Sequence, residues 1–100
     1  MKRIINGKKY NTKTAEYLAS YQIAYRNDFN FCREELYRKR TGEFFLYGKG
    51  GASSKYRKSI SLNEWAGGEA ITPLTEDEAK RWVEANANEE YENIFGEVEE

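Results

Sequence analysis

Apolar residues at helical spacing first appear after residue 12. They recur three and four apart at Ala15, Leu18, Ala19 and Ile23, beside tyrosines that lie four apart at Tyr17, Tyr21 and Tyr25. Residues spaced in this way lie on one face of a helix, and Asn11 or Thr12 can cap its first turn. The pattern predicts an N-terminal helix over residues 12–25, with the tyrosines along the edge of its buried face.

Two turn signals predict hairpins. Asn6-Gly7 separates two short segments, and this dipeptide tolerates the positive φ angles of a tight turn. Thr41-Gly42 separates arms at residues 35–40 and 43–47. A two-residue loop would place Arg40 opposite Glu43, whereas a three-residue loop with a glycine bulge would place Lys39 opposite Glu43 and Leu36 opposite Leu46. We favour the second register, because it pairs opposite charges and pairs aliphatic residues.

The second half of the chain predicts two more strands and two helices. Residues 59–62 and 69–72 are expected to add antiparallel strands to the 35–47 hairpin. Thr75 and Glu78 form a capping box, so a helix begins there, with Ala79, Trp82, Val83 and Asn86 facing inward. A short last helix follows, with Asn88 as its cap and Gly96 as its end, and residues 97–100 are expected to fray. The expected fold class is α+β: a small antiparallel sheet built from hairpins, with an N-terminal helix and one or two C-terminal helices.

Charge is distributed unevenly along what we expect to be a single domain of 100 residues. Residues 1–58 contain fourteen Lys and Arg against five Asp and Glu, a net charge of +9. Residues 59–100 contain two against twelve, a net charge of −10. Such asymmetry favours a polyelectrolyte partner, although the two halves could also neutralise each other in the fold.

The residue types needed for catalysis and for metal binding are scarce. The chain has no histidine, the commonest general base and zinc ligand, and its one cysteine, Cys32, excludes an internal disulfide. The adjacent carboxylates Glu34 and Glu35 point to opposite sides of a strand and make a poor acid/base pair. We expect no enzyme, no cofactor, no metal and no small-molecule substrate. The apolar runs are too short to span a membrane, so we expect a cytoplasmic protein.

Cations and aromatic side chains alternate between residues 37 and 58, a mixture that suits nucleic acid. Cations bind phosphates with release of counterions, and aromatic faces stack on unpaired bases. The candidate partner-binding or RNA-binding residues are Tyr37, Arg38, Lys39, Arg40, Tyr47, Lys49, Lys55, Tyr56, Arg57 and Lys58. The alternative is that these aromatic residues fill a core and the cations pair with the acidic half.

Acidic residues near the C-terminus form a second candidate surface. Clustered carboxylates can occupy a cationic groove built for DNA, as an alternative to their being a solvated helix face. The members of this acidic surface are Glu89, Glu90, Glu92, Glu97, Glu99 and Glu100.

Four segments resemble a group of short proteins from phages and mobile elements of Firmicutes, some of which are anti-CRISPR proteins directed at Cas9. The segments are KRIINGKKYNTKTA at residues 2–15, LYRKRTGEFFLYGKGG at 36–51, ITPLTEDEAKRWVE at 71–84 and EEYENIFGE at 89–97. The resemblance implies a non-enzymatic inhibitor that binds Cas9, or its assembly with guide RNA, and blocks cleavage of target DNA. It supplies no catalytic residues.

A different class of function also fits the basic half. A small phage protein that binds RNA or single-stranded nucleic acid, unrelated to CRISPR, would use the same cations and show affinity for RNA without Cas9, falling steeply with salt.

Overall fold

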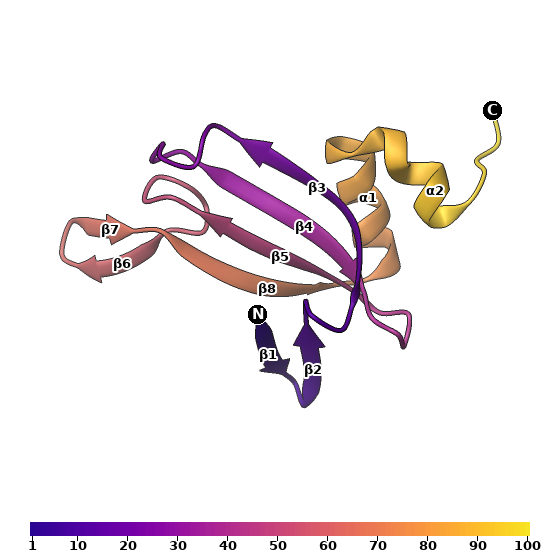
Figure 1. Cartoon of the computed structure of the whole chain (residues 1–100), viewed down its shortest axis with the longest axis horizontal. Coiled ribbons are helices and arrows are strands. Elements are labelled where there is room, and N and C mark those ends of the chain that lie inside the picture. Colours follow the sequence, from indigo (N-terminus) through magenta and orange to yellow (C-terminus); the bar gives the residue numbers. More distant parts are fainter.

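The computed structural model describes residues 1–100 and is built on a four-stranded antiparallel sheet (Figure 1). The sheet has the order β3-β4-β5-β8. The first three strands are consecutive within the sheet, and β8, which comes later in the chain, pairs with β5 and forms one edge. The strands are β3 (Glu16–Ile23), β4 (Cys32–Arg38), β5 (Phe44–Gly50) and β8 (Gly68–Leu74). Mixed strands and helices confirm the α+β class.

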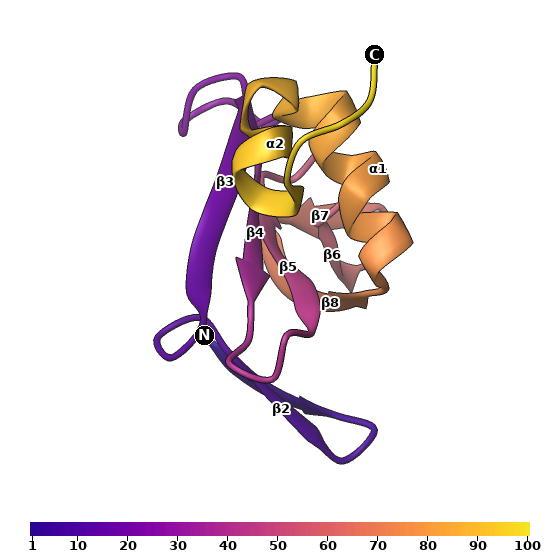
Figure 2. The same cartoon turned by 90° about the vertical axis from the view of Figure 1, so that its right-hand side faces the viewer.

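The helices pack together on one side of the sheet, called here the helix side (Figure 2). They are α1 (Glu76–Asn86), the single 3-10 turn η1 (Asn88–Glu90) and α2 (Tyr91–Phe95). Ala79 and Val83 of α1 are fully buried, as expected, and pack on alternate residues of the strands. The resulting helix-side cluster consists of Leu36, Phe44, Leu46, Ala79 and Val83.

The opposite side of the sheet, called the open side, carries no helix. A two-stranded ribbon, β1 (Lys2–Ile5) and β2 (Lys8–Asn11), packs against this side at the end of the sheet that carries the β4–β5 turn. Tyr10 is the residue of this ribbon that enters the core, where its ring meets Phe45 edge-on at 5.5 Å between centroids. The open-side cluster consists of Tyr10, Tyr37, Phe45 and Ile71.

A second ribbon, β6 (Lys58–Ser61) and β7 (Glu64–Ala66), projects from the other end of the sheet. It pairs only with itself. The expectation that residues 59–62 extend the main sheet is therefore wrong, whereas residues 69–72 do so as part of β8, which pairs with β5. Gly67 and Gly68 redirect the chain between the ribbon and the sheet.

The predicted N-terminal helix at residues 12–25 is wrong, because most of this segment is the edge strand β3. Its pairing with β4 shifts by one residue between Tyr17 and Ala19. Before this bulge, Tyr17 lies on the open side opposite Tyr37, and after it Tyr21 lies on the helix side opposite Glu34. The tyrosine stripe is thus divided between two faces of a sheet.

The local predictions around turns and caps are confirmed. Leu36 pairs with Leu46, the Lys39 amide donates to the Glu43 carbonyl, and Gly42 has φ +92°, which is the three-residue register. Asn6 and Gly7 both have positive φ. Thr75 and Glu78 form both hydrogen bonds of the capping box.

The C-terminal segment differs from its prediction in one detail. Gly96, at φ +95°, ends α2 as expected. Asn88 does not cap this helix with its side chain, since its amide donates instead to the Glu84 carbonyl at the end of α1. Trp82 is only partly buried, and its indole nitrogen donates to Glu34 Oε1 at 3.0 Å. None of the helices combines the length and apolar character needed to cross a membrane.

Candidate functional site

The structure divides the predicted binding residues between the two ends of the sheet. Residues 38–40 lie at the β4–β5 turn, and residues 49 and 55–58 lie near the opposite end. Lys49 lies opposite Arg33, five residue steps along β4 from Arg38, which is about 17 Å at 3.3 Å per residue. The ten residues therefore do not form one continuous surface.

Two of the three cations at the β4–β5 turn are engaged within the protein. Arg38 lies 2.9 Å from Glu16 on the neighbouring strand. Lys39 lies 3.3 Å from Glu43, with its ammonium 4.2 Å from the centre of the Tyr10 ring. Arg40 is exposed and makes no ion pair. Of these three cations, only Arg40 keeps its full charge available for a partner.

The predicted stacking tyrosines of the sheet are largely structural. Tyr37 is 9% exposed, stacks on Phe45 and donates its hydroxyl to Glu35 at 2.9 Å. Tyr47 is half-buried and donates its hydroxyl to Glu69. Burial and the Glu69 hydrogen bond raise the pKa of Tyr47 to about 12. The Tyr37 ring therefore presents no free face of the kind that a nucleobase would need.

Lys55 and Tyr56 converge on a buried carboxylate that the sequence did not single out. Glu34 is 2% exposed, and it accepts hydrogen bonds from Tyr56 Oη and Trp82 Nε1 while Lys55 Nζ lies 2.8 Å away. Burial alone would raise the pKa of Glu34, but hydrogen bonds from these residues and Tyr21 outweigh it, and the net effect lowers that pKa. The group ties the β5–β6 loop and α1 to the sheet, so it is structural.

Five of the ten cations that make no ion pair lie on or beside the β1–β2 ribbon. Directly paired residues of an antiparallel ribbon share a face. Lys2, Ile4 and Lys9 therefore lie on the outward face, away from Tyr10, and all three are exposed. Lys9 and Arg40 line one shallow hollow. We call the group the basic hairpin surface; its members, which make no ion pair, are Lys2, Lys9, Lys13 and Arg40, together with Arg3 on the other face of the ribbon.

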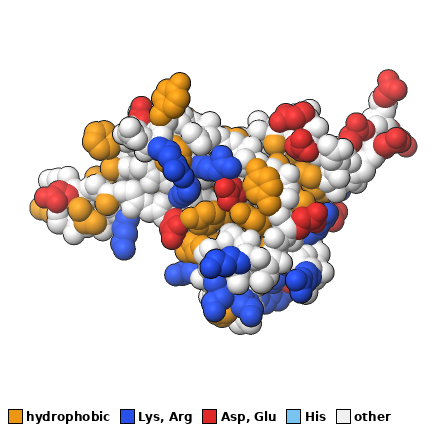
Figure 3. All heavy atoms as spheres, in the orientation of Figure 1, with side chains coloured by type: hydrophobic (Ala, Val, Ile, Leu, Met, Phe, Trp, Pro, Cys, Tyr) orange, Lys and Arg blue, Asp and Glu red, His pale blue; other side chains and the backbone are white.

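The basic hairpin surface and the acidic surface lie on different parts of the molecule. In Figure 3, Lys and Arg side chains gather on the β1–β2 ribbon at the bottom, and Asp and Glu gather over α2 and the C-terminal segment at the right. Each of the six ion pairs joins two residues of the same half, such as Lys8 with Glu43 and Lys80 with Glu76. The two halves thus do not neutralise each other through ion pairs.

Sequence reasoning missed four members of the basic hairpin surface, Lys2, Arg3, Lys9 and Lys13. The signal was present, because the first thirteen residues contain five cations and no acid. The binding surface was predicted in the 37–58 segment instead, because its aromatic residues are typical of a surface that stacks on bases. The structure also contains no group of three or more His, Cys, Asp or Glu residues arranged to hold a metal ion.

Comparison with known proteins finds no match for this chain among protein-family models, curated proteins or solved structures.

Proposed function

We propose that this protein is a non-enzymatic anti-CRISPR inhibitor that binds the assembly of Cas9 with its guide RNA and blocks cleavage of target DNA in the bacterial cytoplasm. The observation that carries the proposal is the basic hairpin surface: five cations without ion pairs on and around one projecting ribbon. The resemblance of residues 2–15, 36–51, 71–84 and 89–97 to short phage and mobile-element proteins, some of which are directed at Cas9, supports the choice of target.

The physical basis is attraction between this surface and the guide RNA. RNA is an extended polyanion, and each phosphate neutralised by a lysine or arginine releases condensed counterions. The outward face of β1–β2 is exposed and projects from the sheet, so its cations can approach phosphates without moving the core. The acids of α2 lie elsewhere and do not compete for them.

The acidic surface supports a rival mode of inhibition by mimicry of DNA. Its six glutamates lie on one 3-10 turn, one five-residue helix and the C-terminal segment. Glu90 and Glu92 also accept hydrogen bonds from Asn93 and from the Val98 amide. Neutralising the last three with Glu97→Gln, Glu99→Gln and Glu100→Gln separates the modes, because Tyr91, Ile94 and Phe95 stay in place.

The test is a DNA cleavage assay with several Cas9 proteins, adding this protein before or after the guide RNA. The Lys2→Glu/Lys9→Glu variant reverses two outward cations, and Arg81→Glu, which reverses an exposed cation of α1 that makes no ion pair, is the control. We expect wild type and control to inhibit and the ribbon variant to lose most of its inhibition. An effect that depends on the order of addition would identify guide loading as the blocked step.

Inhibition retained by Lys2→Glu/Lys9→Glu and lost in the glutamine triple variant would assign the contact to the acidic surface. If wild type inhibits no Cas9, the anti-CRISPR proposal is wrong. The same basic surface favours a second candidate, an RNA-binding phage protein that acts without Cas9. That candidate requires affinity for RNA alone. The slope of log K against log salt concentration should decrease in magnitude by roughly 1.5 when two phosphate contacts are removed.

A further inference from the structure

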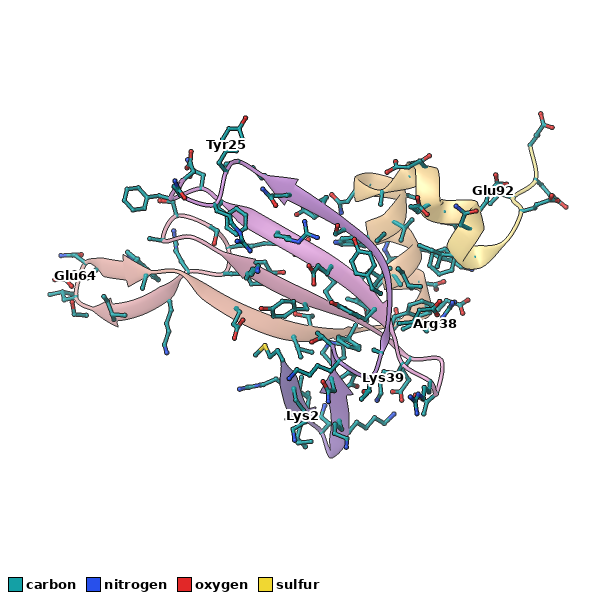
Figure 4. All side chains as sticks on the ribbon, viewed as in Figure 1. Lys2, Tyr25, Arg38, Lys39, Glu64 and Glu92 are labelled. Atoms are coloured by element: carbon teal, nitrogen blue, oxygen red, sulfur yellow. The ribbon has the colours of Figure 1, made fainter.

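Exposed apolar side chains concentrate at the end of the sheet away from the β4–β5 turn. Six of the nine large hydrophobic residues that are well exposed belong to two segments, the β3–β4 loop region and the β6–β7 ribbon. Both segments project at the same end of the sheet (Figures 1 and 4). We call this group the apolar end; its members are Ile23, Tyr25, Phe29, Ile60, Leu62 and Trp65. Single exposed hydrophobic residues are ordinary, but such a concentration marks an interaction site.

The β6–β7 ribbon presents apolar residues without a core of its own. All four residues of β6 are exposed, and no residue of β7 is buried. Leu62, at the turn beside Asn63, is 89% exposed. A two-stranded ribbon alone in water is marginally stable. Apolar side chains at such a tip gain nothing within the monomer, so their place in the sequence is explained by contact with another molecule.

Backbone hydrogen bonds connect the β3–β4 loop internally and to its neighbour, while Tyr25 and Phe29 are exposed to solvent. The Ser53 amide donates to the Phe29 carbonyl at 2.8 Å, and the Phe31 amide donates to the Asp28 carbonyl at 3.0 Å. Ala24 has φ +63°, a left-handed conformation that is costly for a residue with a Cβ. Tyr25, which follows it, is 85% exposed (Figure 4). A hydrogen-bonded loop with exposed rings loses little entropy when it binds.

The charges at this end specify the kind of partner. Arg57 lies over the Trp65 ring at 4.3 Å, and Arg26, Arg57 and Lys58 make no ion pair. Trp, Tyr and Arg dominate the energetics of protein interfaces. Aliphatic tips such as Ile60 and Leu62 offer nothing to phosphates or bases, which distinguishes this end from the basic hairpin surface. A protein surface with apolar pockets and a carboxylate facing Arg57 would complement it.

We infer that the apolar end docks on a protein and, resting on the proposed function, that this protein is the Cas9 polypeptide itself. The basic hairpin surface then contacts RNA, and the apolar end contacts an apolar, acid-bordered site on the protein of the same assembly. Leu62 and Trp65 enter apolar pockets, and Arg57 pairs with a carboxylate beside them. Contact at both surfaces would give greater affinity than either alone.

The experiment measures the affinity of labelled protein for Cas9 without guide, for Cas9 loaded with guide, and for guide RNA alone. The test variant is Ile60→Ser/Leu62→Ser, and the control is Val98→Ser, which changes an exposed aliphatic residue outside the apolar end and outside the basic hairpin surface. We expect the test variant to bind both forms of Cas9 at least about tenfold more weakly. Its affinity for guide RNA and its melting temperature should match those of the control.

Three outcomes would overturn the inference. Unchanged affinity of the test variant for Cas9 would show that the ribbon makes no contact. A loss of affinity for guide RNA would assign the apolar end to nucleic acid. Binding of wild type, but not of the test variant, to vesicles of three parts phosphatidylcholine and one part phosphatidylserine would assign it to a membrane surface. Failure of wild type to bind any Cas9 is a separate result, because it refutes the proposed function and the partner together.

Discussion

The two ribbons, β1–β2 and β6–β7, have the same architecture and opposite relations to the core. The first places Tyr10 in the open-side cluster and is joined to the β4–β5 turn by the Lys8–Glu43 ion pair at 3.0 Å. The second has no buried residue and is joined to the sheet through the chain on either side of it. A short two-stranded ribbon is not stable by itself. The side chains that each ribbon can expose therefore depend on how the ribbon is attached to the rest of the protein.

Anchoring decides which chemistry each ribbon can present. Because Tyr10 fixes β1–β2, its outward face can consist of cations that repel one another at little cost to the fold. The β6–β7 ribbon has apolar side chains that find no site in the monomer. One ribbon is a charged surface on a buried support, and the other is an apolar surface with no buried residue of its own.

The largest effect is expected when the first ribbon loses its anchor. Tyr10→Ala removes a ring that is 5% exposed and should lower the free energy of unfolding by about 3 kcal/mol. For a domain of this size, that lowers the melting temperature by more than about 10 °C. Trp65→Ala, the equivalent truncation in the second ribbon, should cost less than about 1 kcal/mol. Equal losses by thermal denaturation would show that both ribbons are anchored in the same way.

The loop that leads into the second ribbon is attached to the sheet by the contact between Tyr56 and Glu34. Tyr56→Phe removes a hydrogen bond to a buried carboxylate and should cost about 2 kcal/mol in urea denaturation. Gly48→Ala tests the same contact without changing either partner, because a Cβ there would overlap the Tyr56 ring. We expect it to be at least as destabilising as Tyr56→Phe, and additive losses in the double variant would contradict this explanation.

Acidification should weaken the attachment of the first ribbon. Hydrogen bonds from Lys8, Thr41 and Lys39 lower the pKa of Glu43 from 4.5 to about 2. A carboxyl group whose pKa is lowered by folding stabilises the protein fully above its unfolded pKa, and this contribution is lost as the pH falls from about 4.5 to about 2. Wild type should therefore lose stability over this range.

The measurement that isolates Glu43 is the melting temperature of Glu43→Gln as a function of pH. This variant should lose less stability than wild type between pH 5 and pH 2. Glu64→Gln, on the second ribbon, removes a carboxylate that makes no ion pair and serves as the control. An identical pH profile for Glu43→Gln and wild type would mean that the ion pair does not stabilise the protein.

The smallest effect concerns the strained residue beside the apolar end. Ala24→Gly should relieve the left-handed strain at φ +63° and so be neutral or stabilising by up to about 1 kcal/mol. Ala70→Gly, in β8, should instead destabilise the protein, because its backbone is ordinary extended strand. A loss of stability in Ala24→Gly equal to that in Ala70→Gly would show that position 24 is not strained.

Features that depend on neighbouring residues were determined by the sequence alone. The capping box at Thr75 and Glu78, the positive φ angles at Asn6 and Gly7, and the pairing of Leu36 with Leu46 all follow from local geometry. Each depends on residues within about ten positions of one another, so no distant part of the chain could alter it.

Features that depend on distant residues were decided by the tertiary structure. The 12–25 segment has helical spacing, yet pairing with β4 makes it a strand, and the bulge after Tyr17 hides the two-residue period that would have revealed it. The cations fall into the basic hairpin surface only because β1–β2 and the β4–β5 turn meet. The carboxylate of Glu34 is buried only because a loop and a helix converge on it. The sequence gives the residue types and their order. Tertiary packing determines which of these residues are paired, buried or exposed.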